Sequence, residues 1–387
     1  QAGSLPQGNR KKRNALFWYH KGVKNRALFM PGGKEGKKME KLRIAVLFGG
    51  CSTEYEISLQ SAGAVLSHMD ARRLSPLTVG ITKEGRWLYY TGPFEHITDG
   101  TWHTREVYCT PCMLCPDRGE PTLVVRGQHE MRYRFDAAFP ILHGKNGEDG
   151  TVQGMLEMAG VPIIGCGTLA SALCMDKDKA HKLAALAGVE VPRSAVFTRR
   201  ASRAAVENAA QLLGYPLFVK PVCAGSSFGI TKVERPQQLA GAVEEAFRHD
   251  GQVLLEEAVP GFEVGCAVMG NGELFVGEVD EIELSGGFFN YEEKYTLKTS
   301  RIHCPARISE SDAVRIKAAA QTVYRALGCR VFARVDLFLT PQGKVVFNEV
   351  NTIPGFTAHS RYPGMMRAAG LPFDRLVEKL VELGVQK

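Results

Sequence analysis

Buried-strand patterns and helical patterns alternate after about residue 40. Leu42–Phe48, apolar except for Arg43, and Ala137–Leu142 are mainly apolar runs, which are typical of strands buried on both faces. Each run is followed by a glycine-rich loop and then by a helical pattern, over Glu56–Met69 and Thr151–Ala159 respectively. A strand, a glycine-rich loop and a helix start together favour a site at the carboxyl end of the strand. We therefore predict an α/β domain with a mostly parallel sheet over residues 41–163.

The middle of the chain combines helical and strand patterns with a second glycine-rich loop. Leu169–Leu186 is predicted to be one helix, and Tyr215–Pro221 is predicted to be a strand with Lys220 near its end. Residues 224–230 (Ala-Gly-Ser-Ser-Phe-Gly-Ile) do not match the Walker A pattern. Backbone N–H groups and hydroxyls on such a loop still suit phosphate groups, with Lys220 as the nearby charge. The alternative is a tight hairpin turn.

Further patterns follow toward the C-terminus. Val253–Leu255 is an apolar run that leads into Glu256 and Glu257, and two carboxylates at a strand end suit an amino group and a ribose. Residues 285–300 combine glycines with aromatic residues, which predicts a lid. Ser309–Leu327 is predicted to be an amphipathic helix that Ser309 caps.

Residues 335–347 show the pattern of a β-hairpin. Alternating apolar positions over 335–339 indicate a strand, Pro-Gln-Gly at 341–343 indicates a turn, and 345–347 form a second apolar run. We predict two antiparallel strands joined by this turn.

Three oxygen-bearing side chains fall on the predicted hairpin. Asp336 lies in the first strand, and Glu349 and Asn351 are two residues apart in the second, so they share a face. Two carboxylates and an amide suit a hard cation such as Mg²⁺. Arg334 is expected on the opposite side of the strand from Asp336, so a shared site would require a twist or a bulge. The alternative is a surface hairpin whose charges face water.

Composition and charge restrict the class of protein. A chain of 387 residues with 44% hydrophobic and 23% charged residues suits two or three globular domains. Residues 1–40 contain ten Lys and Arg and two Glu, a net charge of +8, so the remainder carries 7 − 8 = −1. A nearly neutral body does not favour nucleic-acid binding. No apolar run is long enough for a transmembrane helix, and no membrane partner is expected.

The first forty residues are predicted to be a disordered basic extension. They show no periodic apolar face and no long apolar region of the kind that a signal peptide carries. The alternatives are sequence upstream of a natural start at Met39 and a functional basic tail.

The chain contains ten cysteines and no sign of secretion, so we expect reduced thiols in the cytoplasm. Cys109, Cys112 and Cys115 have a spacing that suggests an iron–sulfur or zinc site. A fourth ligand at a suitable spacing is missing, and the neighbouring residues favour an ordinary loop and strand.

Several motifs in one order resemble the D-alanine–D-alanine ligases of the ATP-grasp superfamily. The resemblance covers residues 41–387 and is closest to the branch that contains the D-alanine–D-serine ligases of glycopeptide resistance. It implies a parallel-sheet, Rossmann-like domain over 41–163, followed by an ATP-grasp fold with a central lobe (164–255) and a catalytic lobe (256–387). The motifs are FGGCSTEYEISL, LHGKNGEDGTVQG, CMDKDKAHK, FVKPVCAGSSFG and NEVNTIPGFTAHSRYP.

The resemblance also implies roles for particular residues. The implied catalytic residues are Glu54, Ser226, Tyr295, Arg334, Gly355 and Ser360, and the further substrate-binding residues are His143 and Lys294. The implied ATP-binding residues are Lys177, Lys220, Ser227, Glu256, Val259 and Glu263. Asp336, Glu349 and Asn351 would bind two Mg²⁺ or Mn²⁺ ions. The implied activity is the ATP-dependent joining of D-alanine for peptidoglycan in the cytoplasm, by a homodimer formed through the first domain.

This sequence departs from the family pattern at Cys223-Ala224 and at Glu257, so the contacts expected at those positions are in doubt. Lys294-Tyr295 favours an amino acid over a hydroxy acid as the second substrate, and we expect D-alanine, with D-serine as the alternative. A nucleotide-binding protein without ligase activity is a further alternative. A dehydrogenase is disfavoured because the G-x-G-x-x-G fingerprint is absent.

Overall fold

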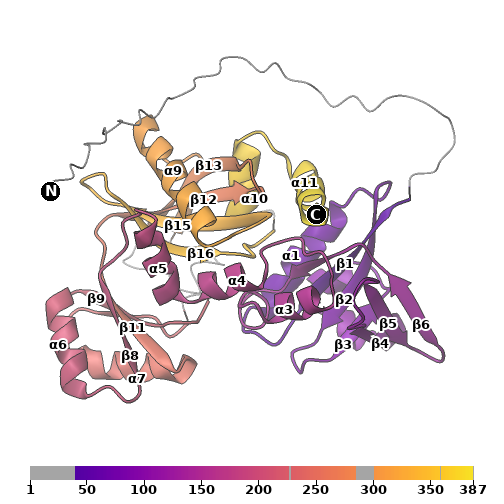
Figure 1. Cartoon of the computed structure of the whole chain (residues 1–387), viewed down its shortest axis with the longest axis horizontal. Helices are drawn as coiled ribbons and strands as arrows, with labels where there is room; N and C mark the ends of the chain where they lie inside the picture. The colour runs from indigo at the N-terminus through magenta and orange to yellow at the C-terminus, as the bar shows by residue number, and fades with distance from the viewer. Residues whose placement is uncertain (1–39, 226–227, 285–299, 358, 387) are drawn as a thin grey trace, which may run out of the picture. The chain divides into compact units, whose positions relative to one another are not determined.

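The computed structural model describes residues 40–225, 228–284, 300–357 and 359–386. Figure 1 shows its helices and strands coloured along the chain. The extension predicted over residues 1–40 lies outside the described residues except for Glu40.

A seven-stranded sheet contains the strands of the first part of the chain. Its order is β6 (Glu130–Arg134), β5 (Thr122–Arg126), β4 (Cys109–Leu114), β3 (Trp87–Tyr90), β2 (Leu74–Ile81), β1 (Leu42–Gly49) and β7 (Ala137–Ile141). Strand β1 pairs in parallel with β2 and β7, whereas the pairs from β2 through β6 are antiparallel. The predicted α/β class is confirmed, but the prediction of a mostly parallel sheet is wrong. Short connections such as residues 82–86 and 127–129 are too short for a parallel crossover, so these strands must pair as hairpins.

The central position of β1 brings two distant loops together. Residues Ile44–Gly49 are buried, as expected of a strand covered on both faces. Because β1 and β7 are parallel neighbours, the loops that follow them leave the same edge of the sheet. The Ser52 hydroxyl donates a 2.7 Å hydrogen bond to the His143 carbonyl across these loops. Glu54 and His143 therefore belong to one edge. The helices of this part are α1 (Tyr55–Ser67), α2 (Glu95–Thr98), α3 (Thr151–Met158) and the 3₁₀ turns Trp102–Thr104 and Glu106–Tyr108.

The predicted single helix over Leu169–Leu186 is two helices, α4 (Thr168–Met175) and α5 (Lys177–Leu186). Asp176 adopts an extended conformation between them, and its carboxylate accepts a 2.9 Å hydrogen bond from the Lys179 N–H. The carboxylate satisfies an N–H that a continuous helix would have bonded internally, so Asp176 starts a new helix. The break places Lys177 at the first position of α5.

A four-stranded antiparallel sheet follows. Its order is β10 (Thr231–Val233), β9 (Leu217–Pro221), β11 (Gln252–Glu257) and β8 (Ser194–Thr198). Helices α6 (Arg203–Leu213) and α7 (Leu239–His249) form a core with one face of this sheet (Figure 1). The 3₁₀ turn Pro236–Gln238 directly precedes α7. The strand register places Lys220 and Glu256 together on the other face.

A five-stranded antiparallel sheet completes the described fold. Its order is β14 (Ser300–His303), β13 (Phe275–Leu284), β12 (Phe262–Met269), β15 (Phe332–Leu339) and β16 (Val345–Asn351). Helix α9 (Glu310–Ala326) packs against it, and the Ser309 hydroxyl caps α9 by accepting from the Asp312 N–H, as predicted. Helices α10 (Arg361–Ala368) and α11 (Phe373–Val385) join a hydrophobic core that also contains β1 and β7 residues. None of the helices in the described ranges is long and apolar enough to cross a membrane.

The three closely spaced cysteines lie on and just after β4. Cys109 packs at the edge of one hydrophobic core, whereas Cys112 belongs to a different core on the other side of the sheet. Burial raises the pKa of the Cys112 thiol to about 12. Side chains in different cores on opposite faces of a strand do not suit a shared metal ion, which supports the ordinary strand that we also considered.

Candidate active site

The hairpin of β15 and β16 brings the predicted metal-binding residues together. Asp336 pairs with Glu349, and Arg334 pairs with Asn351, across the two antiparallel strands. The Asn351 side-chain amide donates a 2.8 Å hydrogen bond to Asp336. The hairpin and the shared face are confirmed.

The expectation that Arg334 lies on the opposite side of the strand from Asp336 is wrong. Arg334 donates hydrogen bonds of 2.8 and 2.7 Å to the two carboxylate oxygens of Asp336. Residues two apart on a strand share a face, so this contact follows from strand geometry and requires no bulge between them. The register does shift between Asp336 and Leu337, on the far side of the pair.

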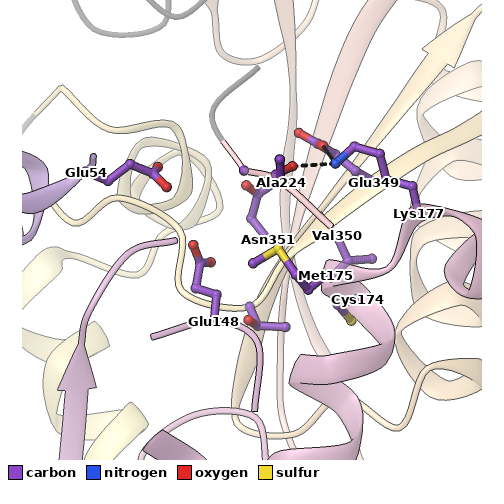
Figure 2. A pocket seen from close by; sticks show the side chains of 11 residues that line it. Glu54, Glu148, Cys174, Met175, Lys177, Ala224, Glu349, Val350 and Asn351 are labelled. Carbon is purple, nitrogen blue, oxygen red and sulfur yellow. Dashed lines mark hydrogen bonds and ion pairs between the residues drawn. The ribbon is translucent and has the colours of Figure 1, made fainter. Parts of the chain in front are cut away.

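Residues from five separate segments line one pocket, which Figure 2 shows. The side chains of Glu54 and Glu148 approach it from the edge of the seven-stranded sheet. Lys177 approaches it from α5, and Glu349 and Asn351 approach it from β16. The Lys177 ammonium donates a 2.6 Å hydrogen bond to the Ala224 carbonyl and lies 4.0 Å from the Glu349 carboxylate. The pocket thus combines a cation with several carboxylates.

His143 is buried beside this pocket in a defined tautomer. Its Nδ1 lies 2.8 Å from the Ile353 carbonyl, which can only accept, so Nδ1 carries the proton. Its Nε2 therefore accepts from the Ser61 hydroxyl at 3.0 Å. Burial lowers the pKa of His143, against the opposing effect of the Glu54 carboxylate. The neutral imidazole joins the first sheet to the loop after β16.

The free energy of unfolding is expected to decrease as the pH is lowered, because His143 is held neutral in the folded protein. The unfolded chain binds more protons below the ordinary imidazole pKa of 6.5, so the free energy of unfolding is fully retained above that pH and decreases below it. Urea unfolding between about pH 7.5 and pH 5 should show this decrease, and His143→Gln should show a smaller one. Equal pH dependence in both proteins would contradict the neutral assignment.

Glu148 is a site residue to which the sequence analysis assigned no role. Its carboxylate accepts a 2.8 Å hydrogen bond from the Gly144 N–H and a 3.0 Å bond from the Ile353 N–H. Burial, and secondly the nearby Glu54 carboxylate, raise its pKa. In the sequence, Glu148 could have been recognised as a site residue by its position between glycines in the loop that follows a buried strand. Glu148 connects that loop to the segment before Gly355.

Replacing Glu148 with glutamine should loosen this connection. The amide offers only one oxygen, so its NH₂ group must face one of the two backbone N–H donors, at a cost of about 1–3 kcal/mol. Urea unfolding measures the loss. Glu157→Gln is the matched control, because the exposed Glu157 also binds a backbone N–H, that of Thr168. Equal effects of the two variants would contradict the assigned role of Glu148.

Three charged side chains that are predicted to bind the nucleotide, those of Lys220, Glu256 and Glu263, form ion pairs within the protein. Lys220 and Glu256 are both buried, and their charged groups lie 2.6 Å apart. Glu263 accepts a 2.8 Å hydrogen bond from Arg361. Val259 lies in the connection between β11 and β12. Ser226, Ser227, Lys294 and Tyr295, with most of the predicted lid, lie outside the described residues.

Arg361 was also missed by the sequence analysis. It donates two 2.8 Å hydrogen bonds to the fully buried Asp280 and lies 3.4 Å from the Asp336 carboxylate, in addition to its bond with Glu263. Arg361 is the first residue of a mainly apolar helix. No pattern in the sequence identifies an arginine in that position as the centre of a network of ion pairs.

Gly355 and Ser360 meet at the start of α10. A Cβ at position 355 would lie 2.9 Å from the Ser360 hydroxyl oxygen, so a larger residue would require the Ser360 side chain to move. The Ser360 hydroxyl accepts a 2.9 Å hydrogen bond from the Thr357 N–H. The loop between β16 and α10 therefore carries both predicted residues in a fixed arrangement.

The donor set suits a divalent cation together with phosphates. Asp336, Glu349 and Asn351 offer oxygen ligands only, as Mg²⁺ prefers, and leave positions for phosphate oxygens and water. No group of three or more His, Cys, Asp or Glu with metal-binding geometry occurs in the described ranges. Carboxylates near buried lysines are also the groups that enzymes of phosphoryl transfer use to hold a divalent cation and phosphates.

Comparison with known proteins gives the family. The pattern described as "D-ala D-ala ligase N-terminus" matches residues 43–166, and "D-ala D-ala ligase C-terminus" matches residues 183–382. The chain belongs to the D-alanine–D-alanine ligase family, whose members are ATP-dependent ligases. This confirms the resemblance and implies ATP and a divalent metal.

Individual relatives cover nearly the whole chain. The D-alanine–D-alanine ligase of Caldicellulosiruptor bescii is 43% identical over 90% of this chain and 96% of its own length. The vancomycin B-type resistance protein VanB of Enterococcus faecalis is also 43% identical, over 90% of this chain and 100% of its own. The crystal structure of the VanG D-Ala:D-Ser ligase from Enterococcus faecalis is 54% identical, with a TM-score of 0.84 over 89% of this chain and 100% of that chain.

Proposed function

We propose that the protein joins two molecules of D-alanine at the expense of ATP, to make a dipeptide for cell-wall peptidoglycan. In the first step, the carboxylate of one D-alanine attacks the γ-phosphate of ATP and forms an acyl phosphate. In the second step, the amino group of the other D-alanine attacks the acyl carbon and releases inorganic phosphate. The relatives named D-alanine–D-alanine ligase support this assignment.

Glu54 is proposed to bind the ammonium group of the first D-alanine. It lies at the edge where the β1 and β7 loops meet, beside Gly144, where any Cβ would collide with the Glu54 carboxylate. His143 lies behind the same edge, where its two ring nitrogens hold the loop in place, and it is proposed to lie near the substrate's carboxylate. Ser226 and Tyr295 are proposed to complete this set.

The phosphate end is assigned to the opposite wall of the pocket. Lys177, Lys220 and the loop around Ser227 are proposed to bind the ATP phosphates. Asp336, Glu349 and Asn351 would hold two divalent cations, which neutralise phosphate charge when bound. Glu256, Val259 and Glu263 are assigned to the base and the ribose.

Arg334 and the Gly355 N–H are proposed to stabilise the oxyanion of the tetrahedral intermediate. Donors already in place cost no reorganisation at the moment of reaction. Arg334 is held by Asp336 in a bidentate contact, which orients its guanidinium. Ser360 and Lys294 are assigned to the second D-alanine, because Ser360 adjoins Gly355.

One observation carries the proposal. The pocket that Lys177, Glu349 and Asn351 line is also lined by Glu54, which comes from the other end of the sequence. A carboxylate for an ammonium group beside groups for phosphate and metal is the arrangement that phosphorylation of an amino acid requires.

The test is phosphate release from ATP with D-alanine alone and then with added D-serine or D-lactate, with products identified by mass. The D-alanine dipeptide as the main product at equal concentrations would support the proposal. Absence of amino-acid-dependent phosphate release would contradict the ligase assignment and favour a nucleotide-binding protein without activity.

A second candidate is a ligase that joins D-alanine to D-serine. The 54% identity with the VanG D-Ala:D-Ser ligase favours it. The two candidates differ by one hydroxyl on the second substrate, which an apolar pocket rejects only about a hundredfold. A mixed D-alanine–D-serine product dominating the same assay would select this candidate.

The homodimer, the cytoplasmic location and the boundaries near residues 163 and 255 stay predictions. Sedimentation of the full chain would measure the oligomeric state. The hydrophobic core shared by β1, β7, α10 and α11 means that the first segment contacts the last one directly.

A further inference from the structure

Three buried cysteines from separate parts of the chain form a cluster of thiols. Cys166 precedes α4, Cys174 lies in the last turn of α4, and Cys329 follows α9; all three are at most 7% exposed. The sulfur atoms of Cys174 and Cys329 are 3.7 Å apart, although 155 positions separate these residues in the sequence. The Cys166 thiol instead donates to the carbonyls of Arg330 and Phe332, at 3.5 and 3.6 Å. The cluster lacks metal-binding geometry, as does every comparable group in the described ranges. Cys174 and Cys329 are therefore a pair of facing thiols.

The backbone holds Cys329 more firmly than Cys174. Gly328 is left-handed at the end of α9, and the Cys329 N–H donates a 2.9 Å hydrogen bond back to the Tyr324 carbonyl. Such a closure is a common end of a helix. Cys174 lies just before Asp176, where α4 stops and α5 begins. If the two sulfurs approach each other, the last turn of α4 is therefore the part expected to move.

Cys174 lies where a small oxidant can meet it. It lines the pocket together with Glu54 and Lys177, as Figure 2 shows. Hydrogen peroxide is little larger than a water molecule, so it can approach Cys174 from this pocket. The pocket that is proposed to bind the substrates thus also gives access to one thiol of the pair.

The two thiols also differ in ionisation, which matters because a thiol reacts with oxidants as the thiolate. The Cys329 thiol acts to lower the pKa of Cys174, but burial and two neighbouring groups together outweigh that effect, so the pKa is raised. The hydrogen bond from Cys166 acts to lower the pKa of Cys329, but its bond with Cys174 and burial raise that pKa well above the ordinary thiol value. Cys174 therefore ionises more readily than Cys329 and is the first of the two to react.

Hydrogen peroxide would join the pair in two steps. The Cys174 thiolate attacks one peroxide oxygen, so that an S–O bond forms, the O–O bond breaks, and the leaving hydroxide takes up the thiol's proton as water. The Cys329 sulfur then attacks the sulfenic acid on Cys174, so that the S–S bond forms, the S–O bond breaks, and a second water leaves with the Cys329 proton. Two thiols and one peroxide become one disulfide and two waters, and two electrons pass from sulfur to oxygen.

A bond between these cysteines would displace residues of the pocket. It would bring the two sulfurs from 3.7 Å to about 2 Å apart. Met175, which follows Cys174, lines the pocket, and Lys177 begins α5 directly after the break. The Lys177 ammonium is placed by its 2.6 Å hydrogen bond to the Ala224 carbonyl. A displacement of about 1 Å at an active site can lower a rate by about a hundredfold, so the bond should impair the pocket.

We propose that Cys174 and Cys329 are a site of reversible oxidation, at which a peroxide forms a disulfide that inactivates the adjoining pocket. This inference goes beyond the proposed function, because the formation of the bond does not depend on which amino acids the pocket accepts.

The test treats the folded full chain with hydrogen peroxide, blocks the remaining thiols and maps disulfide-linked peptides by mass. We expect a linked peptide that joins Cys174 to Cys329. Phosphate release with D-alanine should fall at least about tenfold and recover after dithiothreitol, which reduces the bond by thiol exchange. Cys329→Ala should turn over like the wild type before treatment, form no linked peptide and resist the peroxide. Cys166→Ala is the matched control, because it removes a buried thiol of the same cluster but keeps the pair, so both effects of the peroxide should persist.

The absence of the Cys174–Cys329 peptide from the treated protein would overturn the inference, and so would a bond to Cys166 in its place. A linked protein with undiminished turnover would overturn it as well. An equal loss of turnover in wild type and Cys329→Ala would do the same, because the loss would then come from other oxidised residues. Peptide mapping needs no ligation, so a protein that forms the bond but releases no phosphate with D-alanine would refute the proposed function alone. Calorimetry with adenosine diphosphate would then measure whether the bond impairs the pocket.

Discussion

Replacing Arg334 with alanine is expected to lower the rate of ligation by about 10²- to 10³-fold or more, while the protein still binds the nucleotide. The guanidinium is proposed to stabilise charge that develops only in the transition state, so its loss should appear in kcat. Phosphate release with D-alanine measures the rate, and calorimetry with adenosine diphosphate measures binding.

Two further variants make the Arg334 result specific. Arg334→Lys keeps a positive charge but loses the bidentate contact with Asp336, so an intermediate rate is expected. Arg203→Ala removes an exposed arginine that pairs with Glu207 four residues along α6, and its turnover should equal that of the wild type. Unchanged turnover in a folded Arg334→Ala protein would contradict the proposal that Arg334 stabilises the oxyanion.

Replacing Arg361 with methionine is expected to lower the free energy of unfolding by about 3–5 kcal/mol. Arg361 is the shared partner of Asp280, Asp336 and Glu263, and the first two are at most 1% exposed. Its removal leaves buried carboxylates with less compensating charge. Urea unfolding measures the loss.

The network origin of this loss can be separated from loss of packing. Asp280→Asn removes one of the buried charges, so the double variant with Arg361→Met should lose less than the sum of the two single variants. Arg134→Met is the surface comparison, because Arg134 and Glu120 are 71% and 65% exposed and such pairs contribute about 0–1 kcal/mol. A loss below about 1 kcal/mol for Arg361→Met would show that the network contributes no more than a surface pair.

Local patterns predicted the hairpin and its face correctly. The turn at Pro341–Gly343 and the alternation on both sides of it are set by neighbours in the chain. The register shift between Asp336 and Leu337 then places Asp336 opposite Glu349, because a regular ladder continued from the Leu337–Phe347 pair would have placed it opposite Asn348. Strand geometry also places Arg334 on the same face as Asp336, because side chains two residues apart on a strand point to the same side. The expectation of opposite sides was therefore inconsistent with that geometry. The break at Asp176 was harder to predict, because helix-forming residues lie on both sides of it and only the capping preference of Asp opposes a single helix.

The partners of the missed residues lie far away in the sequence. Glu148 binds the Ile353 N–H, and Arg361 binds Asp280 on β13. Cys174 lies beside Cys329, which follows 155 positions later in the chain. Periodicity shows which face of an element is apolar, but it contains no information on which distant element covers that face.

Neighbouring residues were enough to predict most elements, the hairpin with its acid and amide groups, the glycine-rich loops and, through the motifs, the ligase family. These properties depend on the order of neighbouring residues, whose backbone preferences and side-chain spacing act within a few positions. The packing of distant elements was needed to show that Glu54 reaches the pocket of Lys177 and Glu349 and that Arg361 joins three carboxylates. Those contacts result from burying several apolar faces at once, which depends on the packing of the whole chain.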